Sequence, residues 1–307
     1  MLHHAEVRRR FEEAAGKNAV FENEEMSART SFRIGGAAAL FVTPDSEESA
    51  VEVIRIARES GIPYYVMGNG SNLLVADSGF DGAVIQLAKK MSGIRVEGQE
   101  IRVQCGALLS RIAAEARNAG LDGFSFASGI PGTFGGACMM NAGAYGGEMK
   151  DVLSDVRILD PDGNVRTVFP EEMGLGYRTS AFEKRGDIVL SGTIRLKEGD
   201  PEKIGKRMEE LAQLRKEKQP LTQPSAGSTF KRPKGYFAGK LISDAGLKGY
   251  SIGGAQVSEK HAGFVINTGG ATAEDVRNLI AFIRQTVFEK FGVELETEVK
   301  FLGFEEM

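Results

Sequence analysis

The chain has 307 residues, of which 42% are apolar and 26% are charged, and its net charge is −4. This composition is typical of a globular protein with a full core, and the length predicts two or three domains. The small negative charge gives no bulk attraction to nucleic acid or to anionic lipid, so we expect neither as a partner. No apolar run is long enough to span a bilayer and the N-terminus lacks the apolar core of a signal peptide, so we expect a cytoplasmic protein.

The rare residue types exclude several kinds of site. Cys105 and Cys138 are the only cysteines and lie far apart in sequence, which excludes zinc ribbons, iron–sulfur motifs and disulfide frameworks. We interpret both as small buried thiols. Histidine occurs only at His3, His4 and His261, so a histidine-based triad or a metal site with several histidines has almost no ligands available. We therefore expect no metal site, and any redox cofactor is expected to be organic and held without a histidyl link.

Apolar periodicity predicts a mixed α and β chain. The predicted helices cover 5–16, 46–60 (capped by Asp45 and ended by Gly61), 108–119, 201–217, a short stretch through 241–242, and a long helix capped by Thr272 and Asp275 and ended by Gly292. One strand is predicted to run through 41–42, and a hairpin is predicted over 151–168. Further strands are predicted over 63–67, 83–87, 93–97, 100–105, 188–196, 255–258, 263–267 and 293–302.

A G-x-G sequence follows the strand at 63–67. The segment is Gly68-Asn69-Gly70-Ser71-Asn72-Leu73, and it resembles the start of a dinucleotide-binding loop. A Rossmann loop must open a helix, but here the third glycine is missing and a turn and a strand follow, so we reject that fold. The segment can still present consecutive N–H groups to a pyrophosphate.

The most unusual stretch is 128–147, which holds seven glycines and no charged side chain. Glycine loses the most backbone entropy on folding, so this density needs a reason. A backbone that passes close to a bulky ligand is one reason, and a buried loop between packed elements is the alternative. Asn141 and Tyr145 add polar groups to the apolar wall, which favours a ligand. Together with 68–73, the stretch predicts two glycine-rich walls around one nucleotide.

Six segments carry a resemblance to a known family. In order they are MGNGSNLLV (67–75), GIPGTFGGACMMNAGAYGGE (129–148), GYRTSAF (176–182), PSAGSTFKRP (224–233), AGLKGYSIGGAQVS (245–258) and LETEVKFLG (295–303). Together they resemble the UDP-N-acetylenolpyruvoylglucosamine reductases (UDP-N-acetylmuramate dehydrogenases), the flavoenzymes of bacterial peptidoglycan precursor synthesis. The resemblance covers roughly residues 20–303. The chain is similar to the shorter subtype of the family, which lacks an extra tyrosine-bearing loop.

The resemblance implies an α+β fold. It consists of a two-subdomain FAD-binding unit of the vanillyl-alcohol-oxidase (PCMH) type, followed by a C-terminal α/β substrate domain. On this basis we expect an N-terminal helix over 1–20, an FAD-binding domain over 21–200 with subdomains of about 21–90 and 91–200, and a substrate domain over 201–307 that opens with a linker helix. A monomer is expected.

The resemblance also implies the site residues. Arg178, Ser228 and Glu298 are the implied catalytic positions. The substrate, a UDP-sugar, is implied to contact Tyr145, Lys218, Lys231 and Lys248, and NADPH is implied as hydride donor. FAD is implied to bind noncovalently, which agrees with the scarcity of histidine. The implied FAD positions are Gly68, Asn69, Gly70, Ser71, Asn72, Leu73, Gly129, Gly132, Gly135, Gly136, Asn141 and Gly143.

Two residues depart from the family's usual pattern. Arg232 follows the Phe-Lys pair where the family usually has Asn, and Gly263 follows His-Ala where it usually has Asn. Neither touches the three catalytic positions; both concern polar contacts of the substrate domain.

The chemistry suits these residue types. Hydride addition to an enol ether conjugated to a carboxylate places negative charge on that carboxylate. Arg178 can bind it bidentately, a protonated Glu298 can donate a hydrogen bond, and Ser228 can protonate the adjacent carbon. Two other functions stay open at this point: a flavin oxidase or dehydrogenase on the same unit, and a noncatalytic nucleotide-binding regulator.

Overall fold

The computed structural model describes residues 2–304, and the chain divides into two compact units. Unit 1 contains the chain up to Phe21, Leu40–Asn69 and Gly82–Leu214, whereas unit 2 contains Glu22–Ala39, Gly70–Asp81 and the chain from Arg215. Each unit has its own apolar core. The consecutive domain ranges expected from the sequence stay a prediction.

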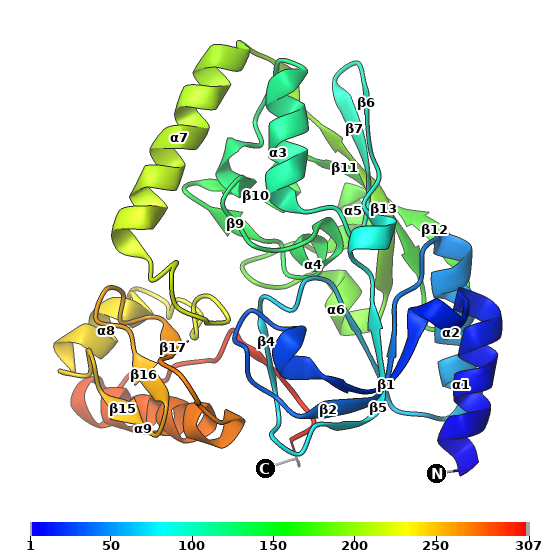
Figure 1. Cartoon of the computed structure of the whole chain (residues 1–307). Coiled ribbons are helices and arrows are strands. Elements are labelled where there is room, and N and C mark those ends of the chain that lie inside the picture. Colours follow the sequence, from blue (N-terminus) through cyan, green and yellow to red (C-terminus); the bar gives the residue numbers. More distant parts are fainter. Residues whose placement is uncertain (1, 305–307) are drawn as a thin grey trace. The chain divides into compact units, whose positions relative to one another are not determined.

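A four-stranded sheet with the order β1-β2-β5-β3 starts the fold. Its strands β1, β2 and β5 each pass from one unit into the other, and β3 pairs with β5 in parallel. Helices α1 and α2 of unit 1 pack side by side (Figure 1). The bounds of these elements are α1 Leu2–Ala15, β1 Val20–Glu25, β2 Ala37–Val42, α2 Glu47–Ser60, β3 Tyr64–Met67 and β5 Phe80–Gln86, with the 3-10 turns Lys17–Ala19, Met26–Ala28 and Lys89–Met91 between or after them.

Helix α2 confirms the predicted helix but corrects its cap. The side chain of Ser46, not Asp45, accepts a hydrogen bond from the Ser49 amide. Both residues are good N-caps, and the helix begins one residue later than an Asp45 cap requires. Gly61 ends the helix in the left-handed conformation as predicted.

The rest of unit 1 is built on an antiparallel five-stranded sheet with the order β12-β11-β13-β7-β6. The predicted hairpin over 151–168 is confirmed by β11 and β12. The elements of this part are β6 Ile94–Glu97, β7 Glu100–Gln104, α3 Leu109–Asn118, β8 Leu121–Asp122, α4 Phe134–Met139, β9 Gly143–Ala144, β10 Gly147–Glu148, β11 Leu153–Leu159, β12 Val165–Val168, α5 Pro170–Met173, α6 Ala181–Arg185, β13 Ile188–Arg195 and β14 Lys197–Glu198, with the 3-10 turns Ser125–Ala127 and Met149–Asp151.

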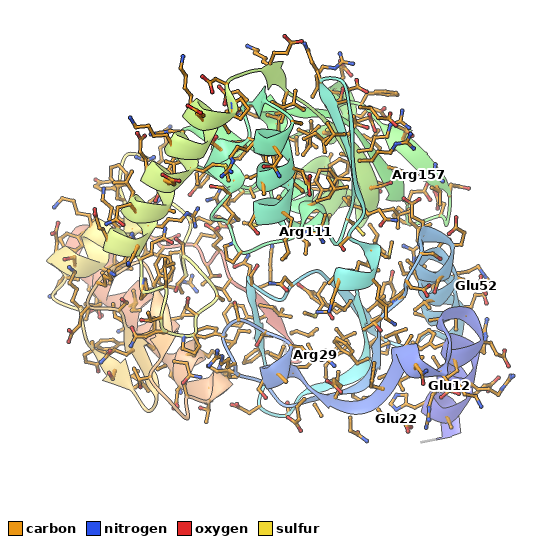
Figure 2. The ribbon with its side chains drawn as sticks, turned by 45° about the horizontal axis from the view of Figure 1, so that its top comes forward. Glu12, Glu22, Arg29, Glu52, Arg111 and Arg157 are labelled. Atoms are coloured by element: carbon orange, nitrogen blue, oxygen red, sulfur yellow. The ribbon has the colours of Figure 1, made fainter. Side chains whose placement is uncertain are left out.

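Glu47 on α2 joins the first part of unit 1 to this sheet. Its Oε2 accepts a hydrogen bond from Arg157 Nε of β11 at 2.9 Å, and its Oε1 accepts from Ser191 Oγ of β13 at 2.6 Å. Arg157 is labelled in Figure 2. One half-buried carboxylate therefore fixes the start of α2 against two neighbouring strands.

The glycine-rich stretch expected to be a loop contains the short helix α4. Helix propensity alone argues against a helix that contains Gly135 and Gly136. Packing decides otherwise, because a Cβ on Gly135 would lie 3.0 Å from Cys105 Cβ, and one on Gly192 of β13 would lie 2.9 Å from the Phe134 ring. The glycines allow the helix to lie directly on the strands.

Unit 2 is centred on α9, which packs on α8 and on a three-stranded sheet with the order β15-β16-β17 (Figure 1). Thr272 and Asp275 form the predicted capping box and Gly292 ends the helix in the left-handed conformation. Helix α7 runs from unit 1 into unit 2. The bounds are β4 Leu73–Val75, α7 Pro201–Lys218, α8 Ala238–Asp244, β15 Ser251–Ile252, β16 Ala255–Val257, β17 Val265–Asn267, α9 Ala273–Phe291 and β18 Lys300–Leu302.

The predicted strand over 293–302 is only partly right. Only β18 is a strand, and it pairs in parallel with β4. Leu295 and Val299 are buried as expected, but Phe301 is exposed and Leu302 is buried. The alternation fails because residues 296–298 hydrogen-bond to a different segment, 229–231, before β18 joins β4. Across residues 2–304, no helix is both long enough and apolar enough to cross a membrane.

Candidate functional site

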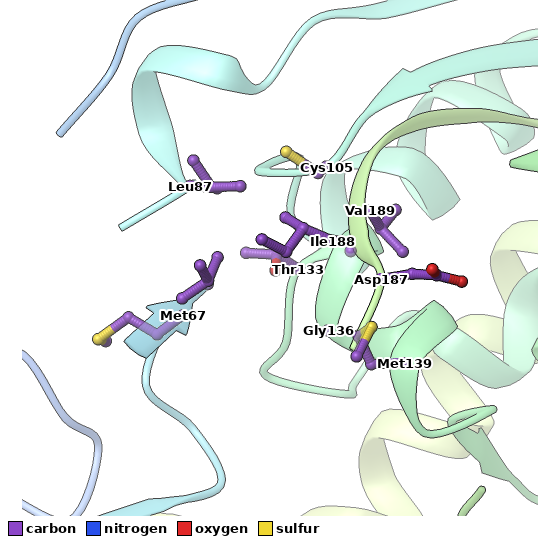
Figure 3. A pocket seen from close by; sticks show the side chains of 12 residues that line it. Met67, Leu87, Cys105, Thr133, Gly136, Met139, Asp187, Ile188 and Val189 are labelled. Atoms are coloured by element: carbon purple, nitrogen blue, oxygen red, sulfur yellow. The ribbon is translucent and has the colours of Figure 1, made fainter. Parts of the chain in front are cut away.

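A pocket of unit 1 lies where the end of β3 meets the glycine-rich stretch (Figure 3). Its lining is mostly apolar and contains glycine at three positions. The residues are Val66, Met67, Gly68, Leu87, Cys105, Thr133, Gly135, Gly136, Met139, Asp187, Ile188 and Val189. Of the predicted FAD positions, the structure therefore brings Gly68, Gly135 and Gly136 to one pocket.

The two predicted walls contact each other at Gly68 and Thr133. A Cβ on Gly68 would lie 2.2 Å from Thr133 Oγ1, so this approach requires glycine. Asn69 Nδ2 donates a hydrogen bond to the carbonyl of Pro131 at 3.3 Å, and Gln86 Nε2 donates one to the carbonyl of Gly68 at 3.1 Å. The Asn69 bond thus joins the segments 68–69 and 129–136, and Gly129 lies in a turn and Gly132 in a bend of the second segment.

The remainder of the predicted phosphate loop, 70–73, belongs to unit 2. Gly70 has a φ of 62° and its carbonyl accepts a hydrogen bond from the Ser31 amide at 3.1 Å. Asn72 Nδ2 donates to the carbonyl of Glu298 at 3.0 Å, and Leu73 opens β4. Ser71 is half-buried. That these residues bind a cofactor stays a prediction.

Arg178 and Tyr145 lie in unit 1, and both have left-handed backbones, with φ of 52° and 51°. Non-glycine residues rarely adopt this conformation, and it clusters at functional sites. Arg178 Nη2 donates to the carbonyl of Gly143 at 3.4 Å, and its guanidinium lies 5.1 Å from the centre of the Tyr177 ring. The structure therefore places Gly143, Tyr145 and Arg178 around one small hairpin, β9–β10.

Asn141, predicted to bind FAD, has a buried side chain whose amide bonds within the protein. Its Nδ2 donates to Glu148 Oε2 at 2.6 Å and to the carbonyl of Gly176 at 3.0 Å, and its Oδ1 accepts from the Lys150 amide at 2.9 Å. Glu148 is not among the residues predicted from the sequence. Its position as the first charged residue after the charge-free stretch is a signal that points to it.

Ser228 and Glu298 come together in unit 2. Ser228 follows Gly227, whose φ of 75° makes the turn. The amide of Glu298 donates to the carbonyl of Thr229 at 2.9 Å, next to an isolated bridge between Phe230 and Thr297. Two predicted catalytic residues that are 70 positions apart thus lie on hydrogen-bonded segments.

Burial distinguishes Glu298 from its neighbours. Glu298 is half-buried, whereas Glu294 and Glu296 are exposed. Glu296 forms an ion pair with Lys231, which follows Ser228 by three residues. A carboxyl that acts as a hydrogen-bond donor must be shielded from water, and of the three Glu298 is the most shielded.

The three predicted lysines differ in their surroundings. Lys231 is half-buried and paired, Lys218 is an exposed residue in the last turn of α7, and Lys248 is exposed in the turn after α8.

Desolvation lowers the pKa of His261, which lies in the same unit as Lys248. The Nδ1 of His261 accepts a hydrogen bond from the amide of Gly263 at 3.1 Å, so the Gly263 departure sits directly against this ring.

Neither cysteine is a nucleophile candidate. Both are buried, as predicted. Desolvation raises the pKa of Cys105 to about 12 and raises the pKa of Cys138 well above its usual value, so neither forms thiolate near neutral pH. Within the part of the chain that the structure describes, no group of histidine, cysteine and acidic side chains could hold a metal ion.

Comparison with known proteins decides the family. Residues 219–302 match the C-terminal domain of UDP-N-acetylenolpyruvoylglucosamine reductase, and residues 38–168 match an FAD binding domain. The chain is 54% identical to such a reductase of Caldanaerobacter subterraneus subsp. tengcongensis over 284 residues, 92% of this chain and 94% of that one. It is 52% identical to that of Clostridium botulinum over 295 residues, 96% of each chain. The chain belongs to the UDP-N-acetylenolpyruvoylglucosamine reductase family.

Solved structures agree with this assignment. The family member of Thermus caldophilus is 39% identical, with a TM-score of 0.79 over 92% of this chain and 98% of that one. A 4-ethylphenol oxidase of Gulosibacter chungangensis is 16% identical, with a TM-score of 0.51 over 96% of this chain and 65% of that one, and shows only a shared fold. The predicted family, its α+β flavin-binding fold and FAD as cofactor are confirmed, and the chain is an FAD-dependent oxidoreductase.

A substitution at Gly68 tests whether the contact between the two walls matters for the cofactor of this family member. We expect Gly68→Ala to lower FAD retention, because its Cβ would collide with Thr133 Oγ1 and force the segments apart. Flavin absorbance per protein after gel filtration measures the loss.

Two further variants serve as controls for this prediction. Gly136→Ala should retain more FAD than Gly68→Ala, since its Cβ meets only Thr133 Oγ1 at 3.7 Å. Adding Thr133→Ala to Gly68→Ala removes the closest atom and should restore part of the FAD. Full retention by Gly68→Ala alone would contradict the expectation.

Proposed function

We propose that the protein reduces UDP-N-acetylglucosamine enolpyruvate to UDP-N-acetylmuramate with NADPH, through noncovalently bound FAD, as a step of peptidoglycan precursor synthesis. The observation that carries the proposal is the hydrogen-bonded pairing of the Ser228 and Glu298 segments. It supports the proposal because the candidate proton donor Ser228 and the candidate hydrogen-bond donor Glu298 lie on or next to hydrogen-bonded segments. We further propose that the enzyme acts as a monomer in the cytoplasm.

The residues of unit 1 fit an FAD. The pocket beside Gly68 is lined mainly by glycines and apolar side chains, together with Thr133 and Asp187, and a backbone without Cβ atoms can approach a nucleotide closely. The segments 68–69 and 129–136 would hold the cofactor without a covalent link. When bound, FAD supplies the hydride that adds to the enolpyruvyl double bond.

Arg178 would bind the carboxylate of the enolpyruvyl group. A guanidinium can bind a carboxylate through two parallel hydrogen bonds, and its fixed charge stabilises the negative charge that develops when hydride arrives. The left-handed turn at Arg178 and its bond to Gly143 hold the side chain before substrate binds. Tyr145 on the same hairpin would contact the substrate.

Ser228 and Glu298 would complete the reaction. Glu298, protonated, would donate a hydrogen bond to the charged carboxylate, and Ser228 would protonate the neighbouring carbon. Lys231, paired with Glu296, would keep positive charge near Ser228. Lys218 and Lys248 would contact the diphosphate or the pyridine nucleotide.

The function is tested by mixing the purified protein with NADPH and the enolpyruvyl substrate without oxygen. The proposal requires one product molecule for each NADPH consumed, and a flavin that is released completely into the supernatant when the protein is denatured. Oxygen consumption with a simple alcohol, and no reaction with the enolpyruvyl substrate, would instead indicate a flavin oxidase.

Ser228→Ala is expected to separate the two half-reactions. Loss of a positioned general acid costs about a hundred- to ten-thousand-fold in rate. Because reduction of FAD by NADPH does not use this proton, that step should stay near the wild-type rate, whereas reoxidation by the enolpyruvyl substrate should slow. Stopped-flow absorbance follows each step. Ser251→Ala, an exposed serine of the same unit, is the control, and a variant slowed only in the NADPH step would assign Ser228 another role.

Glu298 is tested by two substitutions. Glu298→Gln should retain appreciable activity, because an amide still donates a neutral hydrogen bond, whereas Glu298→Ala should lose it. The matched pair Glu294→Gln and Glu294→Ala, at an exposed carboxylate of the same segment, should leave the steady-state rate unchanged. Wild-type rates in both Glu298 variants would remove Glu298 from the mechanism.

A further inference from the structure

The turn that carries Arg178 is fixed on both sides by residues at and just after the C-terminal end of α4. Gly176 and Thr179 bond to each other across the turn. Before Arg178, the carbonyl of Gly176 accepts a hydrogen bond from Asn141 Nδ2 at 3.0 Å. After it, Ser180 Oγ donates to the carbonyl of Met139 at 2.6 Å. The turn is therefore held at two points two residues from Arg178.

Arg178 also contacts the hairpin β9–β10. Gly143 and Glu148 are directly opposite each other in this ladder. The Gly143 carbonyl accepts from Arg178 Nη2. The charge of Arg178 also acts on the Glu148 carboxylate: the pKa of Glu148 lies below its usual range, first because Lys150 donates a hydrogen bond to it, then through the charge of Lys150, the bond from Asn141 and the charge of Arg178.

Asn141 connects the turn that carries Arg178 to the hairpin β9–β10. One amide hydrogen goes to Glu148 and the other to Gly176, while its Oδ1 accepts from the Lys150 backbone. Its side chain is buried and its φ is 45°, a conformation that asparagine tolerates better than most residues. Lys150 Nζ holds the other Glu148 oxygen at 2.8 Å. The carboxylate is thus fixed from two directions.

The geometry points to Asn141 and Glu148 as positioning residues for Arg178: Asn141 joins the Arg178 turn to the β9–β10 hairpin, and Glu148 holds Asn141 and brings its charge to Arg178 from the residue opposite Gly143. A bidentate contact with a carboxylate depends on orientation, so a loosened guanidinium would lose much of its effect. This inference rests on the proposed function for its effect on the reaction, but not for the placement of Arg178 itself.

The test compares Glu148→Gln and Asn141→Gly with the control Glu172→Gln. Glutamine keeps an acceptor for Asn141 but removes the charge. Glycine removes the Asn141 amide yet tolerates the left-handed backbone. Glu172 is an exposed carboxylate of α5 in the same unit that pairs with Arg166 at 3.1 Å.

The first readout is the two half-reactions. Glu148→Gln and Asn141→Gly should slow flavin reoxidation by the enolpyruvyl substrate about 10- to 100-fold, the size of effect that a misplaced group of about 1 Å produces. In Glu148→Gln, FAD content and flavin reduction by NADPH should stay within about twofold of wild type. Glu148→Gln combined with Arg178→Lys should be no slower than Arg178→Lys alone. Equal slowing of both half-reactions, a wild-type reoxidation rate, or losses that multiply would overturn the inference.

The second readout needs no activity. An arginine-directed dicarbonyl reagent, followed by mass spectrometry of the Arg178 peptide, should react about tenfold faster in the two variants than in wild type or Glu172→Gln, as loss of fixed contacts frees the side chain. An unchanged rate overturns the inference. If wild-type flavin is not reoxidised by the enolpyruvyl substrate, the proposed function fails, and this rate alone still decides whether Asn141 and Glu148 hold Arg178.

Discussion

Close backbone packing at glycine is the constraint on which unit 1 depends. Helix α4 lies on β7 and β13 only because Gly135 and Gly192 carry no side chain toward Cys105 and Phe134. The Phe134 ring then fills the space over Gly192 and is fully buried. A close-packed interior of this kind transmits small displacements rather than absorbing them. The position of α4 therefore determines the position of everything attached to its two ends.

Both ends of α4 lead to functional candidates. At its N-terminal end Thr133 meets Gly68 and forms the pocket wall of the predicted cofactor site. At its C-terminal end Met139 and Asn141 fix the turn that carries Arg178. The glycine-rich stretch is thus a tightly packed buried segment that also lines a pocket, and its contact with a ligand stays a prediction.

Unit 2 uses backbone pairing for the same purpose. The segments around Ser228 and Glu298 are held together by main-chain hydrogen bonds, which fix the backbone next to both residues. Support by the main chain suits side chains that are proposed to donate a proton or a hydrogen bond to a ligand.

Local patterns in the sequence predict most secondary-structure elements, and motifs in order identify the family. The helix α9, with its capping box and terminal glycine, and the hairpin β11–β12 each follow from a short continuous stretch of sequence. Three features depend on contacts between residues far apart in sequence. They are the helix Phe134–Met139, the end of the alternating burial near residue 301, and the hydrogen bonds of the Asn141 amide to Glu148 and Gly176. Steric fit at a glycine, burial of a residue and the partner of a buried amide are set by atoms far away in sequence, so no local pattern contains them.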